Sequence, residues 1–381
     1  MKILNINSII DPIDGGGTAE RTIQMSRYLS SEKAIEVSIL TLNIGLTKNI
    51  LDYLKGINLI AVPCINKRYY IPFIFFSGIS QSIKEADAVH LMGHWSIINL
   101  VSYFWIRKFN KPYVVCPAGA LPIFGRSKAL KLFYNFIGGS ACIRNANINI
   151  AISPDEFNHF YEYGAKSNKN ILLPNGIDHH SYLDKDDKDV RRKYSIGNSP
   201  FLLFVGRLNK IKGPDLLLKA FSIISKDYPD YLLIFAGKDE GMEGDLKNLI
   251  DGFNLNNRVK FIGFVQGKNK SQLFHAADLL VIPSRIEAMS IVVLESAITG
   301  TPVLMTNTCG LNEMSGENGA IAVNPDSISI ANGLREMLTS GEELKFRGAK
   351  LKNYVEKNFI WSSIIKNYVQ MYKNIINISN K

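Results

Sequence analysis

Two basic residues in the second half of the chain have the spacing of an anion-binding site. Arg207 follows an apolar run, Phe201–Val205, that is typical of a buried β-strand, and Lys212 stands just before Pro214, which fits the first turn of a helix. An arginine fork, a lysine point charge and a helix N-terminus within eight residues predict a diphosphate clamp. The alternative is two solvated basic residues in a loop.

Two glutamates lie further along, in the stretch that begins Pro283-Ser284-Arg285-Ile286-Glu287. Glu287 is expected in a loop after a strand, and Glu295 about one turn into the following helix, so both could face one pocket. The backbone N–H groups that begin this helix could hold a phosphate; they belong to Met289, Ser290 and Ile291. The alternatives are an exposed helix carboxylate for Glu295 and a partner of the helix dipole for Glu287.

A glycine run lies near the start of the chain, in Asp14-Gly15-Gly16-Gly17-Thr18. It follows an expected first strand, Lys2–Ile6, and precedes an expected helix over 18–30. Glycines let backbone N–H groups approach an anion, and the helix N-terminus adds a positive dipole. A tight strand-to-helix turn without a ligand would give the same pattern.

Taken together, these motifs resemble glycosyltransferase family 4, whose members are retaining, nucleotide-sugar-dependent enzymes of GT-B fold. The resemblance covers nearly the whole chain. It is carried by Gly206-Arg207-Leu208 with Lys212-Gly213, Pro283-Ser284, Glu287 and Glu295 with seven residues between them, Gly300-Thr301-Pro302-Val303, Gly15-Gly16, Pro174-Asn175-Gly176-Ile177-Asp178 and a closing Trp361 to Tyr372 helix.

The resemblance implies a role for each matching residue. Arg207 and Lys212 would grip the donor diphosphate, Glu295 would hold the ribose hydroxyls, and Glu287 would contact the transferred sugar near its reacting carbon. Gly16 and Gly17 would approach the phosphates from the other domain.

Two departures from the family pattern concern the sugar and the acceptor. Ala288-Met289-Ser290 stands where relatives often have Gly-Phe-Gly, so the side chains near the sugar differ. Many relatives carry His-x-His-Gly-x-Trp after the fourth strand, where this chain has His90-Leu91-Met92-Gly93-His94-Trp95. We expect His94, in the loop facing the cleft, to contact the sugar or the acceptor, whereas His90 is either a core histidine or a supporting one.

Short apolar runs alternate with helical patterns along the whole chain, which indicates doubly wound parallel sheets. The expected architecture is α/β: two Rossmann-like domains of the GT-B type that face each other across a cleft and close on the donor. We place the N-terminal, acceptor-side domain at 1–175, with a C-terminal helix over 361–381 crossing back to it, and the nucleotide-sugar domain at 176–360. The strands expected in these two domains cover 2–6, 37–42, 88–91, 113–116, 148–152, 201–205, 231–236, 259–262, 279–282 and 303–305.

The 381 residues carry a net charge of +10, which suits an anionic partner. Most of the excess lies in one quarter of the chain, 61–150, which has ten Lys or Arg and two acids. Aromatic residues stand beside these bases, so an anionic membrane face is one partner; packing of Phe73–Phe76 in the core is the alternative. No apolar run is long enough to span a bilayer, and the four cysteines form no metal-binding pattern, which favours a cytoplasmic protein, peripheral on the inner membrane face if it docks there.

The predicted activity is therefore that of a hexosyltransferase-type glycosyltransferase, acting on a saccharide or lipid-linked saccharide in surface polysaccharide or glycoconjugate synthesis. No metal and no cofactor is required, because the basic residues and helix N-termini would stabilise the leaving nucleoside diphosphate. Two alternatives stay open: a non-hydrolysing sugar-nucleotide epimerase, and a non-catalytic anion- or nucleic-acid-binding protein. The sequence has no nucleic-acid-binding motif, so we expect no nucleic-acid partner.

Overall fold

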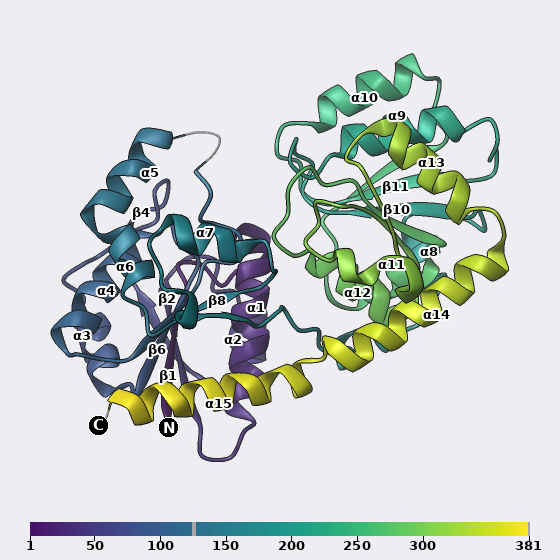
Figure 1. Cartoon of the computed structure of the whole chain (residues 1–381). Helices are drawn as coiled ribbons and strands as arrows, with labels where there is room; N and C mark the ends of the chain where they lie inside the picture. Colours follow the sequence, from purple (N-terminus) through teal and green to yellow (C-terminus); the bar gives the residue numbers. More distant parts are fainter. Residues whose placement is uncertain (124–126, 380–381) are drawn as a thin grey trace. The chain divides into compact units, whose positions relative to one another are not determined.

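The computed structural model describes residues 1–123 and 127–379, and it divides into two compact units (Figure 1). The first unit runs from Met1 to Gly176 and also contains the chain from Trp361 onward, and the second is Ile177–Ile360. Arg126, one of the ten bases counted above, and positions 380–381 of the expected closing helix lie outside the described residues.

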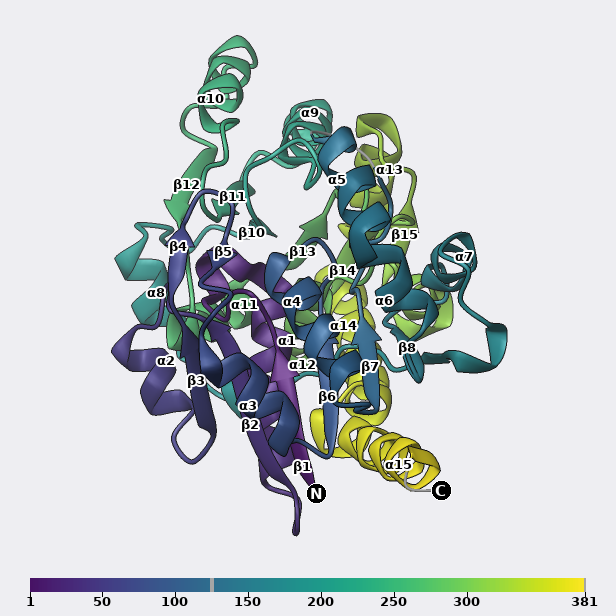
Figure 2. The same cartoon turned by 90° about the vertical axis from the view of Figure 1, so that its left-hand side faces the viewer.

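The first unit is built on a seven-stranded, wholly parallel sheet in the order β3-β2-β1-β6-β7-β8-β9 (Figure 2). Successive residues of β1 point to opposite faces of this sheet, because strand side chains alternate. Leu4 and Ile6 pack toward the helices of one face, whereas the Asn5 amide bonds Ser26 of α1 on the other. Its elements are β1 (Lys2–Ile6), α1 (Pro12–Ser30), β2 (Glu36–Leu42), α2 (Lys48–Tyr53), β3 (Asn58–Val62), a hairpin of β4 (Cys64–Asn66) and β5 (Ile71–Pro72), α3 (Ser77–Glu85), β6 (Ala88–Met92), α4 (Ile97–Lys108), β7 (Tyr113–Cys116), α5 (Lys128–Tyr134), the π-helix η1 (Asn135–Gly139), α6 (Ser140–Arg144), β8 (Ile148–Ala151), α7 (Glu156–Glu162), β9 (Asn170–Leu172) and α15 (Trp361–Ser379).

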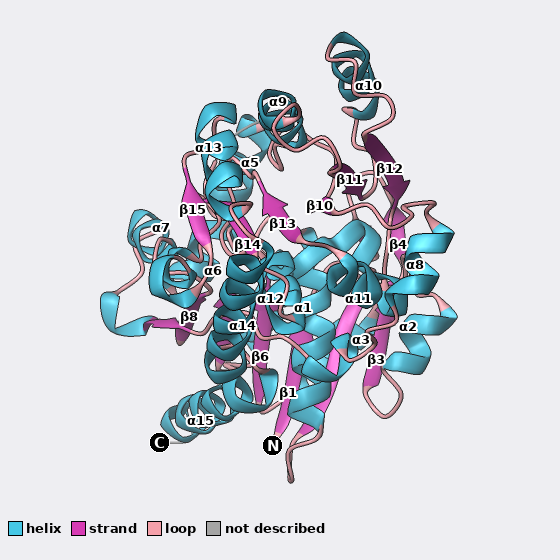
Figure 3. Ribbon diagram, turned by 90° about the vertical axis from the view of Figure 1, so that its right-hand side faces the viewer, coloured by secondary structure: helices cyan, strands magenta, loops and turns pink. Residues whose placement is uncertain are grey.

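The second unit has a six-stranded parallel sheet in the order β12-β11-β10-β13-β14-β15 (Figure 3). All five residues of β10 are buried, as expected for a strand covered by helices on both faces. Leu202 and Phe204 of β10 belong to the core beneath α9, α10 and α13. Its elements are the 3₁₀ turn η3 (His179–Tyr182), α8 (Asp187–Lys193), β10 (Phe201–Val205), α9 (Pro214–Ile224), β11 (Leu232–Ala236), α10 (Glu243–Gly252), β12 (Val259–Gly263), α11 (Gly267–Ala276), β13 (Leu279–Ile282), α12 (Ile291–Thr299), β14 (Val303–Thr306), β15 (Ile321–Val323), α13 (Ser327–Met337) and α14 (Gly341–Asn358).

The closing helix α15, yellow in Figure 1, packs against α1 within the first unit. Arg21 of α1 is buried and donates hydrogen bonds to Asn175 and to the hydroxyl of Tyr368 on α15. A Cβ atom at Gly176 would lie 2.5 Å from the ring of Trp361, so the chain leaves this unit where only a glycine fits. The Pro174–Asp178 motif is thus fixed by the start of α15.

The doubly wound arrangement expected from the sequence is confirmed. In each sheet the strand order reverses next to the first strand, between β1 and β6 and between β10 and β13. Ligands of open α/β sheets bind beyond the carboxyl ends of the strands at such a switch point. The loops after β6, β10 and β13 carry His94, Arg207 with Lys212, and Glu287, and the glycine run lies in the first turns of α1, the helix that follows β1.

Candidate active site

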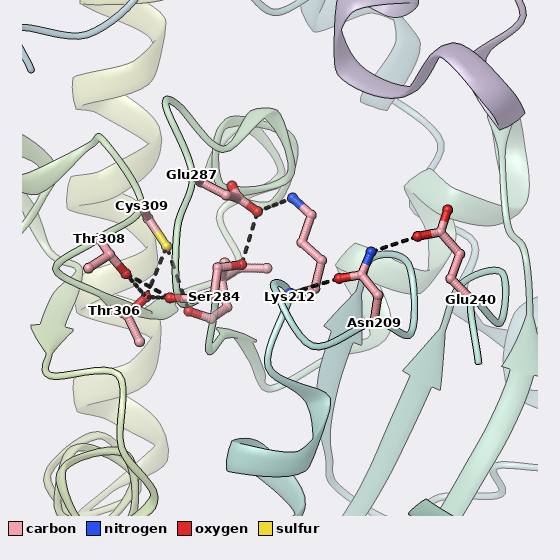
Figure 4. Close-up of polar contacts among 9 residues, drawn as sticks. Asn209, Lys212, Glu240, Ser284, Glu287, Thr306, Thr308 and Cys309 are labelled. Atoms are coloured by element: carbon pink, nitrogen blue, oxygen red, sulfur yellow. Dashed lines mark hydrogen bonds and ion pairs between the residues drawn. The ribbon is translucent and has the colours of Figure 1, made fainter. Parts of the chain in front are cut away.

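The loops after β10 and β13 meet closely in the second unit (Figure 4). Gly213 has a φ of +69°, which favours glycine, and a Cβ atom there would lie 2.1 Å from the carbonyl oxygen of Pro283. The backbone N–H of Arg285 donates to the carbonyl of Ile211 at 2.7 Å. These contacts place the start of α9 directly beside the loop that carries Glu287.

Lys212 and Glu287 form an ion pair across this junction (Figure 4). The Ser284 hydroxyl donates a second hydrogen bond to the same Glu287 oxygen at 3.0 Å. The backbone N–H of Lys212 donates to the side chain of Asn209 at 3.0 Å, which shapes the turn before α9. The Glu287 side chain is only 9% exposed, so the lysine ammonium and the serine hydroxyl replace most of the water that would otherwise solvate its carboxylate. Two of the predicted site residues are therefore in contact.

Arg207 is not part of this ion pair. Its guanidinium contacts Glu240, in the loop after β11, with 3.0 Å between nitrogen and oxygen. Asn209 donates to the other Glu240 oxygen at 2.7 Å (Figure 4). Both predicted diphosphate cations thus lie in the loop after β10, and each is held by a carboxylate from the loop after a neighbouring strand, β11 or β13.

Glu295 lies buried on α12. The Tyr182 hydroxyl donates to its carboxylate at 2.6 Å, and the Lys270 ammonium of α11 lies 2.6 Å from it. The alternative of an exposed helix carboxylate is therefore wrong, because α11 and η3 cover this side of α12. Glu295 and Glu287 therefore have separate polar partners: Tyr182 and Lys270 for Glu295, Lys212 and Ser284 for Glu287.

The start of α12 is fixed by the loop after β14. The helix begins at Ile291, as the sequence predicts, but the Ser290 N–H donates to the carbonyl of Cys309 at 3.1 Å. The expectation that this N–H is available to a phosphate is therefore wrong for this conformation. Met289 and Ile291 lie on either side of it and keep their predicted role as a proposal.

Hydroxyl groups at the end of β14 and in the loop after it hold the loop that carries Glu287 (Figure 4). Thr306 and Thr308 both donate to the carbonyl of Ser284, at 2.5 and 2.7 Å. Burial raises the pKa of the neighbouring Cys309 thiol to about 12, with the Glu287 charge adding to the effect, so this sulfur stays protonated. Cys309 is accordingly a packing residue here rather than a nucleophile.

In the first unit, the glycine run lies within helix α1 rather than before it. Pro12 occupies the first turn, and Asp11 caps the helix by accepting from the Ile13 N–H, so the helix begins six residues earlier than expected. Gly16 breaks the regular helix with φ +57° and ψ −144°. Gly17 follows this kink, and a Cβ atom at Gly16 would meet nothing within 4 Å.

His94 is buried, with 3% of its surface exposed, and its expected contact with the sugar or the acceptor stays a prediction. The burial comes from a cage of aromatic rings supplied by Trp95, Tyr134 and Tyr163, each edge-on to the imidazole. Its Nε2 lies 3.0 Å from Asn135 Oδ1. Burial lowers the pKa of His94 to about 4, so the ring is neutral at pH 7.

His90 is the core histidine that the sequence left as one alternative. It is fully buried on β6, and its Nδ1 lies 2.7 Å from the hydroxyl of Tyr372 on α15. Burial, and then the charge of Arg21, lower the pKa of His90 well below its usual value. Within the described ranges, 1–123 and 127–379, no group of three or more His, Cys, Asp or Glu could hold a metal ion.

Sequence comparisons place both units in known families. Residues 186–357 match the family described as "Glycosyl transferases group 1", and residues 15–181 match "Glycosyltransferase Family 4". The chain is 25% identical to a D-inositol 3-phosphate glycosyltransferase of Geodermatophilus obscurus over 77% of this chain and 70% of that protein. It is 29% identical to spore coat protein SA of Bacillus subtilis, over about half of each chain.

Among solved structures, HepE of Anabaena in complex with UDP-glucose superimposes with a TM-score of 0.81 at 20% identity, covering 98% of this chain and all of that one. This likeness shows the fold, a GT-B arrangement of two Rossmann-like domains. The chain belongs to the group 1 and family 4 glycosyltransferases, and the expected enzyme class, a transferase of glycosyl groups, is confirmed.

The sequence motifs missed several polar partners of the site: Tyr182, Asn209, Glu240 and Lys270. Glu240 carried a usable signal, because it follows β11, the strand beside β10. Lys270 and Tyr182 carried none, since their relation to Glu295 arises only when α11 and η3 pack against α12.

Proposed function

We propose that this protein transfers a sugar, with retention of anomeric configuration, from a nucleotide-diphosphate donor to a saccharide or lipid-linked saccharide in surface polysaccharide or glycoconjugate synthesis. The observation that carries the proposal is the Lys212–Glu287 pair at the switch point of the second sheet, with Arg207 in the same loop after β10 as Lys212. Two cations at this edge suit the two phosphates of a donor.

In the proposed reaction, the bond between the sugar's anomeric carbon and the β-phosphate oxygen breaks, and the electron pair leaves with the nucleoside diphosphate. An acceptor hydroxyl oxygen forms the new bond to the anomeric carbon on the same face, and its proton passes to the departing diphosphate. Arg207 and Lys212 stabilise this developing charge by exchanging their present carboxylate partners for phosphate oxygens. Glu287, released from Lys212, faces the transferred sugar. Charge stabilisation by side chains makes a metal unnecessary in this proposal, and no separate cofactor takes part.

Glu295 is proposed to hold the ribose hydroxyls of the donor. Its carboxylate now contacts Lys270 and Tyr182, so the ribose would replace or join these partners. Gly16 and Gly17 are proposed to approach the phosphates, since the kink at Gly16 leaves open space where a side chain would stand.

A thermal-shift screen with UDP, GDP and ADP tests the donor class. A nucleotide at 100 times its dissociation constant stabilises the folded state by about 2.7 kcal/mol. We expect one of the three to raise the melting temperature and Arg207→Ala to reduce that rise. No response to any of the three would contradict a nucleotide-sugar donor.

We further propose that the first unit docks on an anionic membrane face, which would bring a lipid-linked acceptor within reach. The support is a surface formed by the β4–β5 hairpin, the loop from β5 to α3, and α4, α5 and η1, named here the α4–α5 surface. Figure 2 labels β4, β5, α3, α4 and α5. Phe75 and Phe136 are 81% and 87% exposed on it. The apolar side chains more than a third exposed on these elements are Ile65, Tyr69, Tyr70, Phe73, Ile74, Phe75, Phe104, Leu130, Leu132, Phe133, Phe136 and Ile137.

The parts of the α4–α5 surface adjoin one another through α4. Strand β5 contacts α4, and on η1 a Cβ atom at Gly138 would lie 3.4 Å from Leu100 of α4. Of the residues 73–76 that might have packed in the core, only Phe76 does so, partly buried. Exposed apolar patches of this kind mark partner or membrane surfaces.

The charge of this surface selects an anionic partner. From Leu54 to Pro154 the chain has only two acids, Glu85 and Asp87. Basic residues stand close in sequence to these exposed apolar side chains. Each base near an anionic bilayer adds about 1 kcal/mol of attraction. The bases are Lys67, Arg68, Arg107, Lys108, Lys128 and Lys131. Within the described part of the chain no helix is long and apolar enough to cross a membrane, so contact would be peripheral.

Sedimentation with vesicles tests the membrane contact. Phosphatidylglycerol vesicles are expected to retain the protein at low salt, less at high salt, and less after Phe136→Ser or after Lys128→Glu with Lys131→Glu. Phe346→Ser is the matched control, because Phe346 is 56% exposed on α14, outside the α4–α5 surface. Equal recovery in the supernatant with phosphatidylglycerol and phosphatidylcholine vesicles would remove this proposal and favour a free saccharide acceptor.

A further inference from the structure

A second ion pair joins the same two loops as the Lys212–Glu287 pair. Arg285 donates through both terminal nitrogens to the carboxylate of Asp215, at 2.9 and 2.8 Å. Asp215 lies in the first turn of α9 and is almost fully buried, while Arg285 lies in the loop after β13. Such a bidentate pair fixes direction as well as distance, because the guanidinium is planar.

Further contacts tie Arg285 to the chain just before α9. Its Nη1 donates to the carbonyl of Lys210 at 2.6 Å, and its backbone N–H donates to the carbonyl of Ile211 at 2.7 Å. The Lys210 ammonium reaches the Asp215 carboxylate at 2.8 Å. One arginine therefore bonds three consecutive parts of a turn: Lys210, Ile211 and the first turn of α9.

The two residues proposed to act on the donor are close in sequence to this pair. Lys212 lies between Ile211 and Asp215, and Glu287 is two residues beyond Arg285. The separation of the Lys212 ammonium from the Glu287 carboxylate is thus set by a turn and a loop that Arg285 and Asp215 fasten together. Nothing in the chemistry proposed above requires Arg285 or Asp215 to touch the donor.

We infer that Arg285 and Asp215 are positioning residues of the donor site, which hold the phosphate-binding turn and the Glu287 loop at the separation that transfer requires. This inference rests on the proposed function, in which Lys212 binds phosphate and Glu287 faces the sugar. It assigns both residues a role through Lys212 and Glu287 rather than contact with the substrate.

The electrostatics of Asp215 suit a permanent link. Burial acts to raise the pKa of Asp215, but the hydrogen bonds and charges of Arg285 and Lys210 outweigh it and lower the pKa to about 2. The carboxylate is therefore charged throughout the range in which an enzyme works. Arginine is charged at every such pH as well, so the pair does not loosen with pH.

The experiment compares Arg285→Ala, Arg285→Lys, Asp215→Asn and the double variant Arg285→Ala with Asp215→Asn in the full chain. Arg335→Ala is the matched control, because Arg335 pairs with Asp227 on the surface of the same unit at 3.2 Å. Amide hydrogen exchange of peptides covering 206–213 and 284–290 reports the loops without requiring activity. Donor kcat and KM, and the affinities for UDP, GDP and ADP, report the site.

We expect each alanine or asparagine substitution to speed exchange in both loops together and to leave α10 unchanged. Donor kcat/KM should fall at least tenfold in each single variant, with kcat carrying part of the loss, and the double variant should be no worse than the more impaired single one. Arg285→Lys should fall between wild type and Arg285→Ala, because an ammonium bonds the carboxylate without the fork. Arg335→Ala should match wild type in every measurement.

Unchanged exchange in the two loops, or wild-type kcat/KM in Arg285→Ala, would overturn the inference. Losses that multiply in the double variant would overturn it as well, since they would mean independent roles. Failure of the proposed function would give a different result, because wild-type protein would then bind none of the three nucleotides. The hydrogen-exchange data would still test whether Arg285 and Asp215 hold the two loops together.

Discussion

Replacing Lys212 with alanine removes one member of the ion pair at the centre of the proposed donor site. Lys212 is about a quarter exposed and Glu287 is 9% exposed, so the pair is shielded enough to contribute more than a surface salt bridge. A charge-assisted contact of this kind is worth about 1.5–3 kcal/mol, which corresponds to roughly a 10- to 150-fold fall in kcat/KM if it forms with the donor diphosphate. We expect a loss in that range for Lys212→Ala.

The same substitution carries a cost in stability that must be measured separately. It leaves the Glu287 carboxylate with Ser284 as its hydrogen-bond donor, and an under-satisfied buried group costs about 1–3 kcal/mol. For a domain of this size that lowers the melting temperature by about 2–4 °C per kcal/mol. Steady-state transfer assays well below this melting temperature, with Lys219→Ala as the control on the exposed side of α9, isolate the catalytic effect. Wild-type kcat/KM in folded Lys212→Ala would refute the reasoning.

Three further predictions follow from neighbouring contacts. Glu295→Gln should mainly weaken nucleoside-diphosphate binding, because ribose hydroxyls are held alike in the ground and transition states, and calorimetry showing wild-type affinity would contradict the ribose role. Glu240→Gln removes the charged partner of Arg207 and should tighten nucleoside-diphosphate binding by about 1.4- to 5-fold. That factor corresponds to the loss of a half-exposed ion pair worth about 0.2–1 kcal/mol. Weaker binding by Glu240→Gln would contradict the role of Arg207 in phosphate binding. The folded pKa of His94 is about 4, below the usual 6.5, so stability is complete above pH 6.5 and falls as pH drops toward 4. From pH 7.5 to 5, wild type should lose about 2 kcal/mol more than His94→Gln in denaturant unfolding, and equal losses would contradict the assigned pKa.

The buried central strands could be predicted closely from the sequence. Four of them, β1, β7, β10 and β13, have the expected bounds, because a parallel strand covered on both faces is a short, continuous apolar run. Strands β3, β9 and β15 and the short β4–β5 hairpin were missed. The three sheet strands stand at the sheet edges and are mostly only partly buried, so their composition gives little signal.

Site residues could be predicted where one loop or one helix start holds them. Arg207, Lys212 and Glu287 were predicted because each follows a recognisable strand, and the contact between the last two depends on β10 and β13 being neighbours. Partners from distant segments could not be found this way. Asp215 and Arg285 are 70 residues apart, and nothing local to either residue indicates the other.

The surroundings of His94 could not be predicted either, because they too come from distant segments of the chain. Its place after β6 suggested a loop residue facing the cleft, and nothing in the sequence indicated that Tyr134 of α5 and Tyr163 at the end of α7 enclose it. The helix start at Pro12 is a different error, because a glycine run was taken as the end of a loop. Asp11 and Pro12 supply a cap and a first turn that outweigh the low helix propensity of the glycines that follow.

The central claim is that this glycosyltransferase moves a sugar from a nucleotide-diphosphate donor without a metal. Proton NMR of the full-length protein tests it most directly, with a saccharide acceptor, the nucleotide sugar whose nucleotide stabilises the protein, and excess EDTA. The account predicts release of nucleoside diphosphate together with a new glycosidic anomeric signal of the donor's configuration, and loss of both with Lys212→Ala. An inverted product, an epimerised donor that keeps its nucleotide, or turnover abolished by EDTA would contradict it.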